Sequence, residues 1–137
     1  MLPLPPTLYR AKTVRVIRPS ILSVTVDLGF GVSVVRTVRI DGAPENEIPL
    51  KFRDSAMHCA TVLLGGKRLV IRYHDTESEK VQHAKVYLDE KVFGNPTGFG
   101  HVAGDLDSRL DVGAYLTSLI PLHFNIDLVR KMLNGPE

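Results

Sequence analysis

The sequence predicts an α+β fold: a five-stranded β-barrel of the OB type, with its elements in the order β-β-β-α-β-β-α-α. Two observations predict it. Three strand-type segments open the chain, and a helix-type segment separates them from two further strands and two closing helices. The length of 137 residues suits one domain spanning 1–137. Periodicity alone leaves other α+β arrangements open.

The first three strands follow from β-branched residues and turn signals. Residues 7–18 mix β-branched with basic residues, and Pro19 ends or bulges this strand because it cannot donate to a ladder. Residues 22–28 and 32–40 flank a turn that contains Gly29 and Gly31. Alternation in these two segments predicts one core-facing set: Leu22, Val24, Val26, Leu28, Val32, Val34, Val38 and Ile40.

A helix is predicted after Pro49, which suits a first helical turn, and Gly65 and Gly66 supply its left-handed cap. Residues 67–74 and 83–88 are again strands, separated by a polar loop at 75–80. Residues 89–105 are rich in Gly and Pro, which predicts an irregular connection.

Two helices close the chain. Asp107 or Ser108 is expected to cap the first, which runs to about Ile120, and Asn125 to cap the second. Residues 122–137 form a C-terminal helical extension with apolar side chains at Ile126, Leu128, Val129, Met132 and Leu133. These side chains either fold back onto the barrel or offer a surface for a homodimer or another partner.

Composition limits the class of protein. The chain is 44% hydrophobic and 23% charged, which is ordinary for a globular protein. No apolar run approaches the ~20 residues that a membrane helix needs, so no membrane partner is expected. Cys59 is the only cysteine and the N-terminus is a poor signal peptide, which predicts a cytoplasmic location. No cofactor is expected.

Basic residues gather near the N-terminus. Residues 1–40 hold six Lys/Arg against Asp27, giving +5, whereas the remainder is −3. This asymmetry favours a polyanionic partner, although solvated strand faces would also explain it. The predicted nucleic-acid-binding residues are Arg10, Lys12, Arg15, Arg18, Arg36 and Arg39. Arg15 differs in strand parity from Arg10, Lys12 and Arg18, so a continuous stripe does not follow from spacing.

Four stretches carry a family resemblance: "VTVDLGFGVSV", "RTVRI" with the following "APE", "KFRDSAMHCATVLLGGKRLVIRYHDTE" and "AKVYLDE". In this order, residues 9–119 resemble the staphylococcal nuclease (thermonuclease-like) domain, closest to its small bacterial and phage members. The resemblance implies an OB-type barrel with a Ca²⁺-dependent phosphodiesterase site.

Two of the family's metal acids have no counterpart here. The family's D-G-D-T-like motif falls on Arg18, Pro19, Ser20 and Ile21, so neither acid is present. Calcium needs several oxygen ligands, and a guanidinium at this position repels it. We therefore expect no metal site and no catalytic residues.

Other parts of the family's machinery are displaced. The resemblance implies a residual nuclease-like site of Arg39, Asp41, Glu45 and Glu47, but the spacing is about two residues short. A general base must reach its water, so this shortening is a serious defect. The family's second arginine is absent, and His83 is the nearest candidate cation.

The sequence therefore predicts a catalytically inactive, nuclease-like binding module that contacts a protein or nucleic acid, such as a phage-type regulator or inhibitor. The alternative is a divergent metal-dependent nuclease. In that case Asp27, Asp41, Glu45 and Glu47 would supply a displaced cation site.

Overall fold

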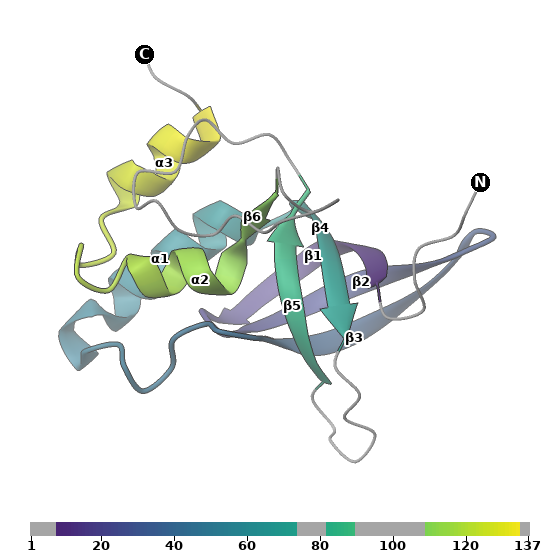
Figure 1. Ribbon diagram of the computed structural model, residues 1–137, viewed down its shortest axis with the longest axis horizontal. Helices are drawn as coiled ribbons and strands as arrows, with labels where there is room; N and C mark the ends of the chain where they lie inside the picture. The colour runs from purple at the N-terminus through teal and green to yellow at the C-terminus, as the bar shows by residue number, and fades with distance from the viewer. Residues whose placement is uncertain (1–7, 74–81, 90–108, 135–137) are drawn as a thin grey trace.

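The structure, a computed structural model, describes residues 8–73, 82–89 and 109–134 (Figure 1). It confirms an α+β fold in which five strands close into a mixed barrel beside the helices, an arrangement consistent with the OB type. The elements are β1 (Leu8–Arg18), β2 (Ile21–Gly29), β3 (Val32–Ile40), η1 (Leu50–Phe52), α1 (Arg53–Leu64), β4 (Arg68–Tyr73), β5 (Gln82–Leu88), β6 (Leu110–Asp111), α2 (Val112–Ser118) and α3 (Ile126–Asn134).

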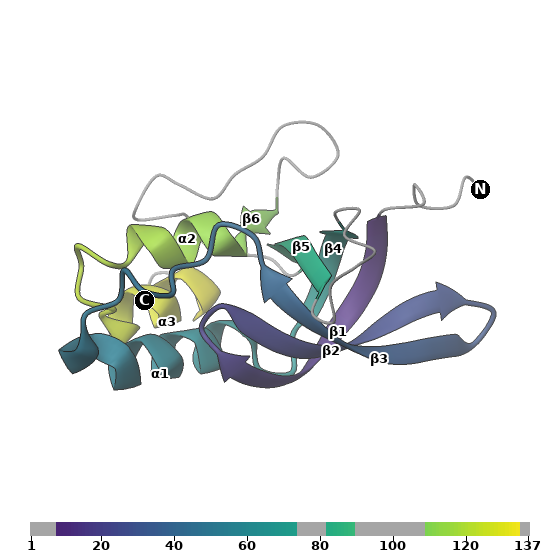
Figure 2. The ribbon, with the colours of Figure 1, turned by 90° about the horizontal axis from the view of Figure 1, so that it is seen from below.

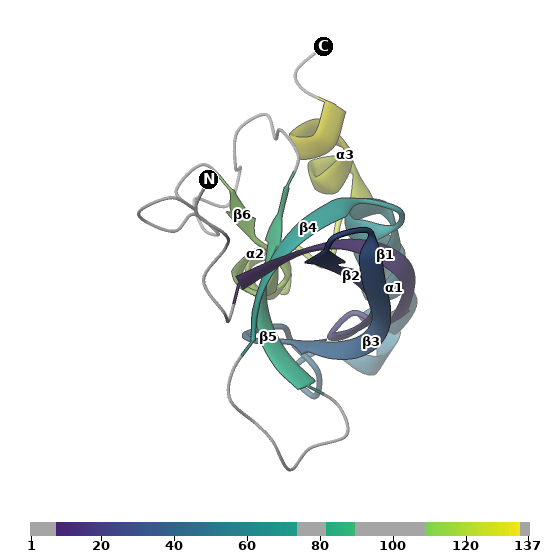
Figure 3. The same cartoon turned by 90° about the vertical axis from the view of Figure 1, so that its right-hand side faces the viewer.

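The barrel strands follow the order β3-β2-β1-β4-β5, and each neighbouring pair is antiparallel. The barrel closes where β3 and β5 pair in parallel, with Val38 opposite Gln82 and Ile40 opposite Ala84 (Figure 3). The other end of β5 pairs on the same edge with β6, a short strand that the sequence did not predict. One edge of β5 thus closes the barrel and also holds the start of α2.

The core fills the barrel and extends under the helices. Alternating residues of β2, β4 and β5 point inward and are fully buried, among them Leu22, Val24, Leu69, Ile71 and Val86. Helix α1 closes one end of the barrel with an apolar stripe that includes Ala56, Cys59, Ala60, Leu63 and Leu64. All three α-helices lie toward this end of the molecule (Figure 2).

The C-terminal helix folds back onto the chain's own core. Val129 and Met132 of α3 are fully buried, and Ile126, Leu128 and Leu133 pack partly buried against the same cluster. Of the two alternatives for this helix, the structure shows that it folds back onto the core, and nothing in the fold supports a homodimer.

Strand β1 contains two irregularities that decide which side chains point outward. Thr13 pairs with Val24 of β2, and the next pair is Arg15 with Ser23, so β1 uses two residues where β2 uses one. The same mismatch occurs between Val16 and Arg18. Val14 and Ile17 are therefore extra residues, as in β-bulges. Each bulge inverts the alternation of buried and exposed positions along β1.

Strands β2 and β3 extend beyond the barrel as a two-stranded arm, defined here as residues 27–35 (Figure 2). The last pairing of β2 with β1 is Val26 with Ala11, and β3 pairs with β5 only from Val38, so among the described residues no third strand pairs with the arm. The prediction that Leu28 and Val32 face the core was wrong, because the alternation continues past the point where the barrel ends. Both side chains are about half exposed.

The predicted start of the helix after the connection was also wrong. Residues Leu110 and Asp111 pair with β5, so α2 begins at Val112 and Asp111 caps it by accepting a hydrogen bond from the Ala114 amide. The alternative caps Asp107 and Ser108, the loop at 75–80 and nearly all of the connection at 89–105 lie outside the described residues. Of the two glycines after α1, Gly66 takes the left-handed conformation, with φ +69°.

Within the described part of the chain, no helix is both long and apolar enough to cross a bilayer.

Candidate functional site

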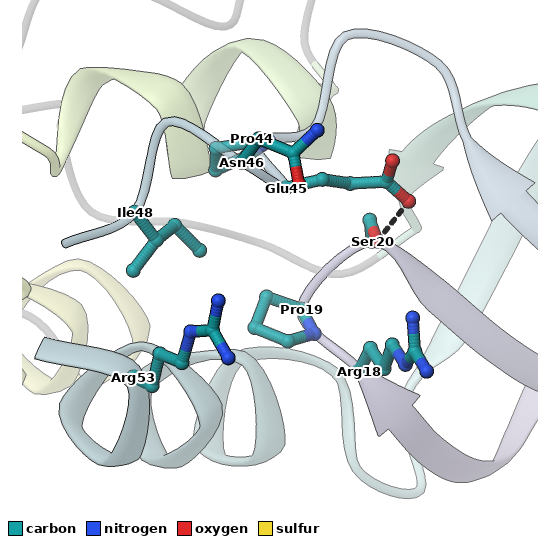
Figure 4. A pocket seen from close by; sticks show the side chains of 8 residues that line it. All are labelled: Arg18, Pro19, Ser20, Pro44, Glu45, Asn46, Ile48 and Arg53. Carbon is teal, nitrogen blue, oxygen red and sulfur yellow. Dashed lines mark hydrogen bonds between the residues drawn. The ribbon is translucent and has the colours of Figure 1, made fainter. Parts of the chain in front are cut away.

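A pocket of about 380 Å³ opens beside the β1–β2 turn (Figure 4). Arg18 and Pro19 come from the end of β1, Arg53 from the first turn of α1, and Pro44, Glu45 and Ile48 from the loop after β3. Prolines and Ile48 supply apolar walls, and the charged lining consists of two guanidinium groups and one carboxylate, that of Glu45. Such a surface suits an anionic group joined to an apolar or planar one.

Ser20 and Glu45 are joined directly in this pocket. Ser20 is 2% exposed, and its hydroxyl donates to Glu45 Oε1 at 2.8 Å. The same oxygen lies 3.5 Å from Nε of Arg39. Glu45 therefore faces a hydroxyl and a guanidinium at the position where the resemblance implies a metal, which leaves few free oxygen ligands for a cation.

The other residues of the expected residual site are placed differently. Glu47 turns back into its own loop, where its carboxylate accepts from the Glu45 amide at 2.8 Å, and this hydrogen bond lowers the pKa of Glu47. Asp41 lines a second pocket. His83 lies across the parallel β3–β5 pairing from Arg39. The fold thus brings Arg39 and Glu45 together, while the structure gives Asp41 and Glu47 other surroundings.

No group of three or more metal-ligating side chains lies together within residues 8–73, 82–89 and 109–134. In particular, Asp27 is at the arm, where its carboxylate accepts from the Gly29 amide at 2.8 Å. The four acids of the alternative, displaced cation site are therefore not assembled into one group.

The second pocket, of about 610 Å³, lies between the end of β3, β5 and α2. Its charged lining residues are Asp41, Lys85 and Asp111, with Lys85 Nζ 4.0 Å from Asp111 Oδ2. Asp111 also caps α2, and Thr117 donates to the Gly42 carbonyl at 2.7 Å. These contacts serve the junction between α2 and the barrel.

Four cations of β1 lie on the outer side of the barrel wall. Because of the bulges at Val14 and Ile17, Arg15 pairs with outward-facing Ser23 rather than with a buried residue, and Arg18 pairs with Ile21. Neighbouring strands add cations in register, since Arg68 lies opposite Lys12 and Arg39 lies opposite Ile21. We call the following residues the basic face: Arg10, Lys12, Arg15, Arg18, Arg39 and Arg68.

Carboxylates are almost absent from the barrel strands. Strands β1–β5 contain nine Lys/Arg, four in β1, two each in β3 and β4 and one in β5, against Asp27 alone. The overall charge of +2 therefore conceals a strongly basic barrel wall, balanced by acids in helices and loops. Val14 at 59% exposure and Val35 at 61% place apolar surface among these cations.

Arg36 does not belong to this face. It pairs with Val24, which points into the barrel, and its own side chain is exposed at the residue that follows the arm. Burial raises the pKa of Tyr73, and the Arg36 guanidinium partly offsets that rise.

Sequence reasoning missed Arg53 and Arg68. Arg53 begins α1, and only the packing of that helix against the end of the barrel brings it beside Arg18. Arg68 lies in a strand that was predicted, and its pairing with β1 could have been inferred from the barrel topology. The position of Arg68 could therefore have been inferred from the sequence, whereas nothing in the sequence indicated that of Arg53.

No known protein-family model matches this sequence, and no curated protein is significantly similar to it.

Proposed function

We propose that this chain is a catalytically inactive, staphylococcal nuclease-like barrel that binds nucleic acid through the basic face. The observation that carries the proposal is the alignment of Arg10, Lys12, Arg15 and Arg18 along one side of β1. Cations arranged along a barrel wall neutralise successive phosphates of a strand, and OB-type barrels bind single strands in this manner.

The pocket beside the β1–β2 turn extends this surface. Arg18 belongs both to the basic face and to the pocket, so a strand lying along β1 leads into it. Arg53 adds a second guanidinium, and Pro19 and Ile48 provide apolar contact for a sugar or a base.

Binding without cleavage is supported by the contacts of Glu45. Its oxygen accepts from Ser20 and faces Arg39, and Arg18 occupies the position of a metal acid in the resembling family. Metal activation of water and electrostatic stabilisation are each commonly worth ~10²-fold or more in rate. A site that lacks the metal acids loses most of that acceleration.

The test is the salt dependence of binding to a fluorescent single-stranded oligodeoxythymidylate, measured by anisotropy. Five phosphate contacts, from the basic face without Arg39, which is paired with Glu45, give a slope of about −3.5 in log K against log salt at ~0.7 per contact. This slope means about 130-fold weaker binding between ~50 and ~200 mM salt. Lys12→Gln, Arg15→Gln and Arg18→Gln together remove three contacts. We expect a slope of about −1.4 and a loss of about 7-fold over the same range.

A charge-matched variant provides the control. Lys51→Gln, Arg130→Gln and Lys131→Gln remove three exposed cations from η1 and α3, away from the basic face. This triple variant is expected to keep the wild-type slope. A flat salt response, or equal losses in both triple variants, would reject the proposal.

Incubation of supercoiled plasmid with Ca²⁺ or Mg²⁺ completes the test. We expect no nicking. Cleavage that a chelator abolishes would instead support the divergent metal-dependent nuclease.

A further inference from the structure

The arm carries four apolar side chains that are exposed to solvent. Phe30 at its tip is fully exposed, at 105%, and Leu28, Val32 and Val35 are exposed at 46%, 53% and 61%. Between Asp27 and Arg36 the sequence has no charged residue. The arm therefore differs sharply in character from the neighbouring basic face.

Phe30 at the tip has a backbone conformation that is unfavourable for an aromatic residue. Gly29, Phe30 and Gly31 have φ values of +86°, +55° and +74°, so Phe30 is a non-glycine residue in the left-handed region between two glycines. Bulky residues are rare there because Cβ crowds the backbone. Neither burial nor a packing contact compensates for this strain, which points to a role in binding.

We infer that the arm is a base-stacking element: Phe30 stacks on an unpaired base of a single strand whose phosphates lie on the basic face. This inference rests on the function proposed above. Aromatic side chains next to cationic grooves hold single strands because every base presents a flat apolar surface, and its phosphates need separate cations.

The placement of charge favours a single strand over a duplex. A ribbon inside a duplex groove is flanked by phosphates, and the arm offers them only Asp27, which is negative. Unpaired bases turn their faces outward, so an uncharged tip meets bases without meeting phosphates. Thr25 pairs with Lys12, and Phe30 lies five positions further along the arm, which puts the tip at most about 17 Å from that cation at ~3.3 Å per residue.

The inference predicts a separation of two effects. Phe30→Asn removes the ring and keeps a residue that tolerates the left-handed turn. We expect affinity for the oligodeoxythymidylate to fall between about 5-fold and 150-fold, the range for loss of one stacked base, with the salt slope unchanged. The melting temperature should not fall, because Phe30 makes no stabilising contact.

A fluorescent variant reports on stacking directly. The chain has no tryptophan, so Phe30→Trp places a unique indole at the tip. We expect wild-type affinity or better and quenched emission when the single strand binds. Leu122→Trp, at an exposed position in the turn between α2 and α3, is the matched control and should show no quenching.

Each outcome separates the inference from the proposed function. If the wild type binds with a steep salt slope but Phe30→Asn binds equally well, the inference is overturned and the function stands. If the wild type binds no oligonucleotide, both fail. A third outcome would show that the arm docks on membranes. In that case the indole fluorescence of Phe30→Trp changes with vesicles of phosphatidylserine and phosphatidylcholine, while Phe30→Asn leaves oligonucleotide binding unchanged. This outcome would also overturn the inference.

Discussion

Replacing Glu45 by glutamine is expected to strengthen nucleic-acid binding. Glu45 is the carboxylate next to Arg39, with Oε1 3.5 Å from the guanidinium Nε. Removing its charge releases Arg39 to a phosphate and removes a repulsion from the end of the basic face. Glu45→Gln should still accept the hydrogen bond from Ser20, because the amide keeps an oxygen in that position.

The size of the effect follows from one additional phosphate contact. A slope of ~0.7 per contact gives about 5-fold tighter binding at ~0.1 M salt, and a salt slope steeper by ~0.7. The Arg39–Glu45 pair is 40% and 37% exposed, so its loss should cost no more than ~1 kcal/mol of unfolding free energy.

Anisotropy titration at several salt concentrations measures both quantities, and urea denaturation measures the stability. Asp127→Asn makes the same change of charge on the exposed surface of α3 and should leave binding unaltered. Weaker or unchanged binding by Glu45→Gln would refute the assignment of Arg39 to the basic face. If the wild type cleaves nucleic acid and Glu45→Gln does not, Glu45 is a general base and the protein is an enzyme.

Three further predictions concern the scaffold. Gly113→Ala should lower the thermal midpoint clearly, by ~1–3 kcal/mol of stability, because the added Cβ would collide with the Asp41 carbonyl oxygen in the backbone; a normal melting curve would refute this. Burial raises the pKa of Cys59 to about 11, so iodoacetamide at pH 8 should label the thiol only after denaturation, and its contribution to stability should decline as pH rises from about 9 to about 11. The hydrogen bond from the Glu45 amide lowers the pKa of Glu47, so the stability lost in Glu47→Gln should be present at neutral pH and vanish as pH falls through the pKa of the folded carboxyl. Urea denaturation across that pH range checks this, and a difference that grows on acidification would contradict it.

The barrel could be predicted because burial in strands follows a simple alternation. Leu22, Val24 and Val26 are buried as that alternation requires. Leu28 continues the same pattern and is exposed, since the limit of the barrel is set by where β1 stops pairing with β2. Periodicity identifies a face, but neighbouring strands decide how much of it is covered.

The basic face shows a different limit. In a regular strand, odd and even positions face opposite sides, so Arg15 was expected on the side of β1 opposite Lys12. Spacing alone does not predict that the two residues share a side. A bulge is a property of pairing between two strands, so its position cannot be read from one of them. The exposed β-branched residues Val14 and Ile17 are the trace it leaves in the sequence.

Local charge, rather than net charge, governs what such a surface attracts. At ~0.1 M salt the Debye length is ~10 Å, so an acid on a distant helix hardly weakens the field above β1. Because Asp27 is the only acid in β1–β5, a ligand at the barrel wall meets cations with little opposition, although the whole chain carries only +2. The arm lacks charge where the wall is rich in it, and this contrast fits a strand of nucleic acid, which offers phosphates to one surface and bases to the other.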